Sequence, residues 1–172
     1  FHLRGRQQVG VGHQQRGGSR VTCFDRRHGL VGGSHPDDVD ALLLQQMLAL
    51  AVDWRVGVVP RPVEELIAVP ELARYVAGWP RKGDVGFVFE DGRPLGAAWW
   101  RSFTEADAGY GFIDEATPEL SIAVIPAARR QGVGTMLLDA LLDEARRRAT
   151  PAISLSVEPD NPAVVLYERL GF

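Results

Sequence analysis

A run of arginine and glycine residues between an apolar strand and an apolar helix is well suited to bind an anion. The run, residues 129–135, reads Arg129-Arg130-Gln131-Gly132-Val133-Gly134-Thr135. Glycines let the backbone approach a ligand closely, and the free amides at a helix start carry about half a unit of positive charge. Two arginines beside such a turn favour a phosphorylated ligand over a simple carboxylate.

Two common phosphate-binding patterns do not fit this run. A P-loop requires a lysine directly after its second glycine, whereas Thr135 follows Gly134. A dinucleotide fingerprint requires a small residue three positions after the second glycine, and Leu137 stands there. The simplest alternative is a glycine-rich connection that binds nothing, and the run by itself leaves that alternative open.

The remaining pattern, Arg-x-x-Gly-x-Gly after a strand that ends in Val-x-Pro, resembles the acetyl-CoA loop of the GCN5-related N-acetyltransferase (GNAT) family. A second stretch near the C-terminus is similar to another signature of that family. It reads Asn161-Pro162-Ala163-x-x-Leu166-Tyr167-Glu168-x-Leu170-Gly171-Phe172. Two motifs in the expected order are more specific than one, and together they cover roughly the last third of the chain.

The resemblance implies an α/β fold with a mixed, mostly antiparallel central sheet flanked by helices. It also implies transfer of an acetyl group from acetyl-CoA to a primary amine of a small molecule or peptide, by direct attack on the thioester. In the family, loop amides hold the pyrophosphate, and the preceding strand splays from its neighbour to bind the pantetheine arm. The cofactor-binding residues implied here are Ile122, Ala123, Val124, Arg129, Arg130, Gln131, Gly132, Val133, Gly134, Thr135 and Asn161.

Tyr167 matches the family tyrosine that commonly acts as the general acid toward the departing thiolate. A phenol with a pKa near 10 is protonated at neutral pH and can supply that proton. The structural alternative is that Tyr167 fills an apolar helix stripe with Leu166 and Leu170. Asn161, followed by a proline, is also expected to cap the helix that contains these residues.

The general base is less clear from the sequence. Some relatives carry a glutamate where this chain has Ser156, and serine cannot hold a proton at pH 7. We select Glu119, at the start of the central strand, with Asp114, Glu115 and a bound water as alternatives. Deprotonation at pH 7 costs about 4.6 kcal/mol for a lysine but only about 1.1 kcal/mol for an α-amine. A weak base would therefore favour α-amino or other acceptors of low pKa.

A different class of function is a non-catalytic acyl-CoA-binding or protein-interaction module with a degenerate active site. Ser156 supports this alternative, and so does the stop at Phe172, because the family continues with one or two further strands. The expected domain, residues 35–172, would then be C-terminally truncated with an unpaired sheet edge. A partner, such as a second copy in a homodimer, could cover that edge.

The 172 residues, of which 45% are hydrophobic, suffice for one domain with a single core. Residues 1–34 contain six arginines and one acid, and we predict a disordered or non-native basic extension there. Residues 35–172 carry a net charge of −8, which argues against a nucleic-acid partner. The first strand of the family would have to lie within residues 29–32, which form a poor strand.

Several classes of site and location are excluded or disfavoured by missing residues. Cys23 is the only cysteine, and all four histidines lie at or before His35. A cysteine zinc site, a Ser-His-Asp triad and a histidine metal site are therefore excluded from the body of the chain, and we predict no metal. No apolar run approaches the roughly 20 residues that span a bilayer, so we predict a cytoplasmic protein without membrane contact.

Hydrophobic periodicity and turn residues place the elements around these motifs. Helices are expected at about residues 36–50, 71–78 and 134–148, and after Pro162; strands are expected at residues 85–89, 95–100, 120–124 and 151–157. The adjacent Trp99 and Trp100 must face opposite sides of their strand, one into the core and one outward or toward the acceptor site.

Overall fold

The computed structural model describes residues 2–5, 20–24, 36–55 and 57–172, and these form one mixed α/β unit. The elements are β1 (His2–Gly5), β2 (Arg20–Phe24), α1 (Pro36–Val52), α2 (Val63–Ile67), α3 (Pro70–Ala73), β3 (Val85–Glu90), β4 (Pro94–Arg101), η1 (Glu105–Asp107), β5 (Glu119–Val124), η2 (Pro126–Ala128), α4 (Val133–Arg147), β6 (Ile153–Ser156) and α5 (Val164–Arg169). The predicted strands and the two predicted long helices are confirmed to within a few residues.

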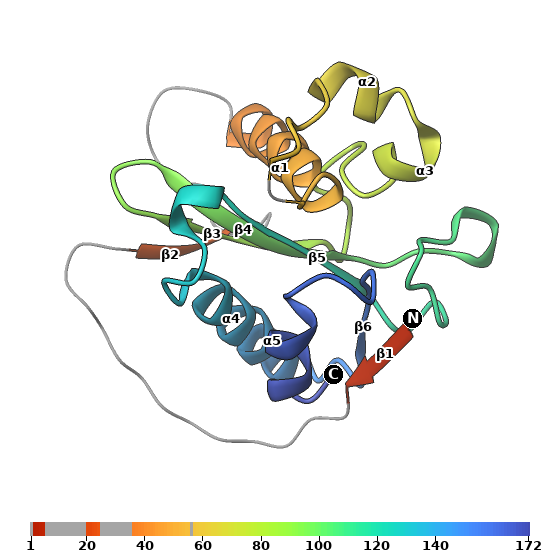
Figure 1. Ribbon diagram of the computed structural model, residues 1–172. Coiled ribbons are helices and arrows are strands. Elements are labelled where there is room, and N and C mark those ends of the chain that lie inside the picture. Colours follow the sequence, from red (N-terminus) through yellow and green to blue (C-terminus); the bar gives the residue numbers. More distant parts are fainter. Residues whose placement is uncertain (1, 6–19, 25–35, 56) are drawn as a thin grey trace.

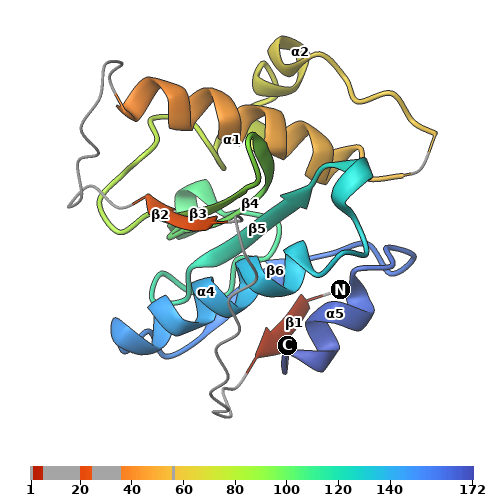
Figure 2. The same ribbon diagram turned by 90° about the vertical axis from the view of Figure 1, so that its left-hand side faces the viewer.

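The molecule has three layers, with the sheet in the middle (Figure 1). Helices α1, α2 and α3 cover one face of the sheet, and α4 and α5 cover the other. The view turned by 90° shows α1 and α4 on opposite sides of β5 (Figure 2). Among the described residues, no helix is long and apolar enough to cross a membrane.

The sheet has six strands in the order β1-β6-β5-β4-β3-β2. All neighbouring pairs are antiparallel except β5 and β6, which are parallel. Their register is confined to one pair, Glu119 opposite Ser154, where the Ser154 amide donates to the Pro118 carbonyl at 3.0 Å. Beyond this point no further pairing joins the two strands, which leaves one edge of β5 without a neighbouring strand among the described residues.

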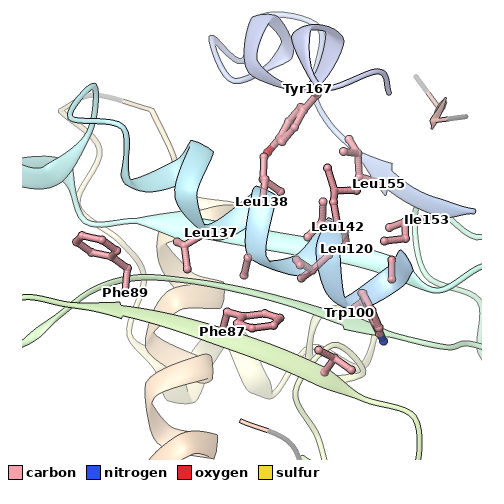
Figure 3. Packing of buried hydrophobic residues seen from close by; sticks show 14 of the residues in the cluster. Phe87, Phe89, Trp100, Leu120, Leu137, Leu138, Leu142, Ile153, Leu155 and Tyr167 are labelled. Atoms are coloured by element: carbon pink, nitrogen blue, oxygen red, sulfur yellow. The ribbon is translucent and has the colours of Figure 1, made fainter. Parts of the chain in front are cut away.

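Two apolar clusters fill the space on either side of the sheet. The cluster below β5 joins the sheet to α4 and α5, and Figure 3 shows Leu137, Leu138 and Leu142 of α4 among strand residues such as Phe87. The cluster on the other face packs α1 and α3 against the sheet. Because helices cover both faces, alternation along a strand does not separate buried from exposed side chains.

This double cover explains one wrong expectation. Trp99 and Trp100 do lie on opposite faces of β4, but both are buried. The Trp99 indole donates to the Tyr75 carbonyl at 3.1 Å, and the Trp100 indole donates to the Gly83 carbonyl at 3.0 Å. Neither ring is therefore a surface residue or a free platform for an amine.

The first strands of the sheet differ from the prediction. The strand before α1 is β2, which pairs with β3, whereas residues 29–32 lie outside the described residues. The edge of β6 is not unpaired, because β1 lies antiparallel to it from His2 opposite Ser156 to Gly5 opposite Ile153. The prediction of a disordered or non-native extension over residues 1–34 missed both strands, and the rest of that segment lies outside the described residues.

Both strands were missed for a physical reason. A strand of four or five residues has few side chains, so its sequence pattern is weak. Such a strand forms because the main-chain groups at the edge of a sheet need hydrogen-bond partners, and this need is not visible in the strand's own sequence. The region after α1 also differs in detail. The predicted helix over residues 71–78 is confined to α3 and irregular turns, and α2 was not predicted.

Candidate active site

The turn before α4 has the geometry of an anion-binding helix start. Arg130 and Gly132 both have positive φ, +63° and +85°, and Gly132 is the residue that precedes the helix. The first helix turn contains no acid and no side-chain cap. The Met136 amide is the first to bond within the helix, at 3.0 Å from the Gly132 carbonyl, so the preceding amides are available to a ligand.

The edge of β5 that β6 leaves open lies directly before this turn. Main-chain groups alternate sides along a strand. The Pro118 carbonyl points to β6, whereas the Ile125 amide bonds to Leu95 on the β4 side at 2.9 Å. By this alternation the amides of Ile122 and Val124 point to the open edge.

Ala123 lies between these two residues and has the opposite orientation. It is opposite Ala97 in the β4 register, and its side chain is buried on the α1 face. Of the three strand residues implied as cofactor contacts, Ile122 and Val124 are therefore the two whose amides reach the open edge. A free strand edge beside a cradle of amides fits an extended amide-containing arm that ends in a pyrophosphate, as in coenzyme A.

Arg129 has a different place from the rest of the turn. Its Nε donates to the Val124 carbonyl at 3.1 Å, and its Nη1 donates to the Trp54 carbonyl at 2.9 Å. The guanidinium thus ties the end of β5 to the segment after α1. Gln131 donates to the Ala127 carbonyl at 2.7 Å, so its side chain stabilises the turn itself.

The remaining loop residues begin α4. Val133 is buried under the sheet, Gly134 follows in the first turn, and the Thr135 hydroxyl accepts from Arg169 of α5 at 3.0 Å. Asn161 lies in the turn before α5, where its Oδ1 accepts from the Ala163 amide at 2.9 Å. The residue at the N-cap position of α5 is Ala163, so the predicted helix cap is replaced by a side-chain bond within the preceding turn. The bond between Thr135 and Arg169 joins the start of α4 to α5.

Tyr167 projects from α5 into the apolar cluster, and Figure 3 shows its ring beside Leu138 of α4. The ring packs edge-on against Phe172 with centroids 6.2 Å apart. Its hydroxyl makes no hydrogen bond to any described residue, and burial raises the pKa of this phenol to about 12. The predicted apolar packing is confirmed, and the phenol is protonated at neutral pH.

Glu119 lies on the opposite face of β5, at the start of the strand. Its Oε1 accepts from the Tyr75 hydroxyl and from the Gly111 amide, each at 2.8 Å. Its Oε2 is buried without a partner among the described residues. Burial is the main reason why the pKa of Glu119 is raised, and this outweighs the two hydrogen bonds.

Tyr75 and the segment after α1 were not identified from the sequence. The Tyr75 hydroxyl accepts from the Tyr110 amide at 2.7 Å while it donates to Glu119, so it fixes the loop between β4 and β5. The Trp54 indole donates to Glu158 at 2.9 Å. The contacts of Tyr75 with Glu119 and of Trp54 with Glu158 join residues that are 44 and 104 positions apart in the sequence. No local sequence pattern indicates such contacts.

The other proposed bases have different surroundings. Asp114 Oδ1 accepts from the Ala116 amide at 3.1 Å, within the loop before β5, and Glu115 is exposed in the same loop. Ser156 ends β6 and is exposed. Glu119 is therefore the carboxyl group of this set that is buried against the sheet.

The chain matches known proteins along most of its length. The model of the acetyltransferase (GNAT) family matches residues 44–172. Over 61 residues the chain is 46% identical to the ribosomal protein bS18-alanine N-acetyltransferase of Escherichia coli (strain K12). This matched segment makes up 35% of this chain and 40% of that protein. The chain thus matches less than half the length of this curated relative.

Solved structures show the same fold. The Salmonella typhimurium protein yncA, solved with its cofactor acetyl-CoA, is 25% identical with a TM-score of 0.59, covering 90% of this chain and 79% of that one. The ribosomal-protein-alanine N-acetyltransferase of Brucella melitensis is 26% identical with a TM-score of 0.53, covering 79% and 80%. The predicted acetyltransferase class, cofactor and fold agree with these relatives, and the chain belongs to the acetyltransferase (GNAT) family.

Proposed function

We propose that this chain transfers the acetyl group of acetyl-CoA to a primary amine by direct attack of the amine on the thioester. The observation that carries the proposal is the open edge of β5, with the amides of Ile122 and Val124, directly before the amide cradle of residues 130–135. Bound acetyl-CoA supplies an acyl group already activated for attack. The residues of the chain must hold it, exclude competing reactions and move two protons.

The first proton goes to the leaving sulfur. As the new C–N bond forms and the C–S bond breaks, the Tyr167 hydroxyl donates its proton to that sulfur. Because burial raises the pKa of Tyr167 to about 12, the phenol is protonated throughout the neutral range. The ring of Tyr167 packs in the apolar cluster with α4 and edge-on against Phe172.

The second proton leaves the amine. We assign its acceptance to Glu119 Oε2, directly or through one water, because this oxygen has no partner among the described residues whereas Oε1 is fully used. A raised pKa brings a carboxylate closer to the pKa of the amine that it must deprotonate. Because Glu119 contacts Tyr75 on the α1 face of β5, the acceptor amine would reach it from that face.

An α-amine is the acceptor that this arrangement suits best. Removing a proton at pH 7 costs about 1.1 kcal/mol for an α-amine and about 4.6 kcal/mol for a lysine. A single buried carboxyl can offset the smaller cost more readily. Two of the relatives, from Escherichia coli and Brucella melitensis, are named as N-acetyltransferases of alanine in ribosomal proteins. We therefore propose a peptide with an N-terminal alanine as the acceptor.

The test is a thiol-release assay of the full chain with acetyl-CoA and two matched peptides. One peptide has a free N-terminal alanine and no lysine, and the other has a blocked N-terminus and one lysine. We expect release with the first at a kcat/KM at least tenfold above the second at pH 7. Equal rates on both peptides, or no turnover on either, would contradict the assignment of the acceptor, and no turnover on any primary amine would contradict catalysis.

The burial of Glu119 and the exposed Ser156 also favour a second function, a module that binds acyl-CoA without turnover. Such a module would bind acetyl-CoA in calorimetry but release no thiol with any amine. It keeps the cofactor site and dispenses with the proton acceptor. Calorimetry and the thiol assay on the same preparation therefore separate the two functions.

A further inference from the structure

The open gap between β5 and β6 is bridged at its outer end by two residues that follow α1. Trp54 contacts both sides, because its carbonyl accepts from Arg129 in the turn after β5 and its indole donates to Glu158 in the loop after β6. Arg55 adds contacts on the β6 side, to Glu158 at 2.8 Å and to Asp160 at 3.1 Å. In Figure 2 the end of α1 and the turns after β5 and β6 lie at the same end of the molecule.

We propose that Trp54 and Arg55 form a strap that closes the gap over bound acetyl-CoA and slows its release. The strap rests on the proposed function, since the gap is where the pantetheine arm would bind. Both are positioning residues, because they act by holding the cofactor between β5 and β6. The closing contacts must break when the cofactor leaves.

The strength of these contacts suits a strap that opens. The side chains of Arg55, Glu158 and Asp160 are 49%, 55% and 64% exposed, and pairs at such exposure contribute little to folding stability. Yet Trp54 and Arg55 together make four polar contacts with Arg129, Glu158 and Asp160. The Arg55 guanidinium also lies 4.7 Å from the centre of the Trp54 ring.

Arg129 links the strap to the cofactor turn. Its guanidinium bonds the Val124 carbonyl at the open edge and the Trp54 carbonyl of the strap. The turn that holds the pyrophosphate and the strap that covers the arm are thus joined through one side chain. This explains why Arg129, unlike Arg130, has its side chain occupied by the protein.

The test measures the dissociation rate of acetyl-CoA by stopped flow in the full chain and in Arg55→Gln. We expect the variant to release acetyl-CoA about fivefold faster, with a raised KM for acetyl-CoA and an unchanged kcat. The wild-type release rate should rise with KCl more steeply than that of the variant, because only the wild type has the screened ion pairs. Arg55→Lys, which keeps the charge, should restore most of the slow release.

A double-mutant cycle identifies the partners. Glu158→Gln with Asp160→Asn should release acetyl-CoA as fast as Arg55→Gln, and adding Arg55→Gln to that pair should change little. Trp54→Phe should have a smaller effect, because it loses the indole donor but keeps the carbonyl bonded to Arg129. Asp143→Asn, which removes the exposed Arg146–Asp143 pair on α4, is the matched control and should leave the rate unchanged.

Failure of the strap can be distinguished from failure of the proposed function. Wild-type release rates in Arg55→Gln, with the same salt dependence, would overturn the strap while acetyl-CoA still binds. Absence of acetyl-CoA binding by the wild type would overturn both. A melting temperature lowered in Arg55→Gln with no change in release would show a purely structural contact and would also overturn the strap.

Discussion

The two faces of β5 hold two halves of the candidate site that are built in different ways. On the α4 side, the amides of residues 130–135 and the open strand edge come from one continuous segment of the chain. On the α1 side, Glu119 accepts hydrogen bonds from Tyr75 and Gly111. Its neighbour in the β4 register, Arg101, pairs with Asp84. The comparison shows that main-chain recognition can be local, whereas side-chain positioning depends on distant parts of the chain.

The largest effect is expected on the α1 side, from Arg101→Leu. Arg101 is buried, pairs with Asp84 at 2.5 Å and donates to the carbonyls of Arg74 and Ala77. Its loss leaves a buried, unpaired carboxylate and should destabilise the fold by about 3–5 kcal/mol. Chemical denaturation measures this loss.

Asp84→Leu combined with Arg101→Leu provides the control for that prediction. Replacing both charges should recover part of the stability, because no unpaired charge remains. Below its melting temperature, Arg101→Leu should still bind acetyl-CoA with wild-type affinity. A parallel loss of affinity would show that the two halves are not independent.

The next effect is on the α4 side, from Tyr167→Phe. Removing the hydroxyl should lower kcat about a hundredfold, the lower end for a general acid, and leave the affinity for acetyl-CoA unchanged. Steady-state kinetics with calorimetry make the comparison. Because Phe keeps the ring in its apolar contacts, an unchanged kcat would assign Tyr167 to packing alone.

Gly132→Ala tests whether the cofactor is held by backbone geometry. A side chain at φ +85° costs about 1–2 kcal/mol, and the free turn can relieve this strain by leaving the observed geometry. Binding must then restore that geometry, so acetyl-CoA should bind about 5–30-fold more weakly. Calorimetry gives the dissociation constant. Gly92→Ala, at φ +66° in the turn between β3 and β4, is the matched control with similar strain and no expected effect on binding.

The smallest effect concerns the pH dependence of stability through Glu119. Its pKa is raised in the fold, so its stabilising contribution is present below the pKa of the unfolded state and is lost as pH rises through the folded value. The difference in melting temperature between Glu119→Gln and the wild type should therefore be a few degrees more favourable to the variant at pH 8 than at pH 5. Thermal melts at both pH values test this.

The same variant tests the proton acceptor. Glu119→Gln keeps an acceptor for Tyr75 and Gly111 but cannot take a proton, so kcat should fall at least tenfold at every pH where the wild type is active. Wild-type kcat in a stably folded variant would remove Glu119 from the reaction. It would leave the carboxyl group as an anchor of the loop between β4 and β5.

The sequence by itself determined the local features of the α4 side. The glycine pattern before α4, the strand before it and the signature of α5 are short-range patterns with a direct physical reading, and the family match agrees with that reading. In contrast, the separation of β5 from β6 is a property of two strands together, and no single strand encodes it.

Only the tertiary structure decided which distant residues meet. In the folded chain β1 pairs with β6 and β2 pairs with β3. Both tryptophans of β4 are buried, and Arg129 donates a hydrogen bond to the Trp54 carbonyl. Edges of a sheet and buried carboxyl groups need partners, but many segments of a chain can supply them. Such pairings depend on how the chain folds in three dimensions, whereas a turn of glycines before a helix depends on a few neighbouring torsion angles.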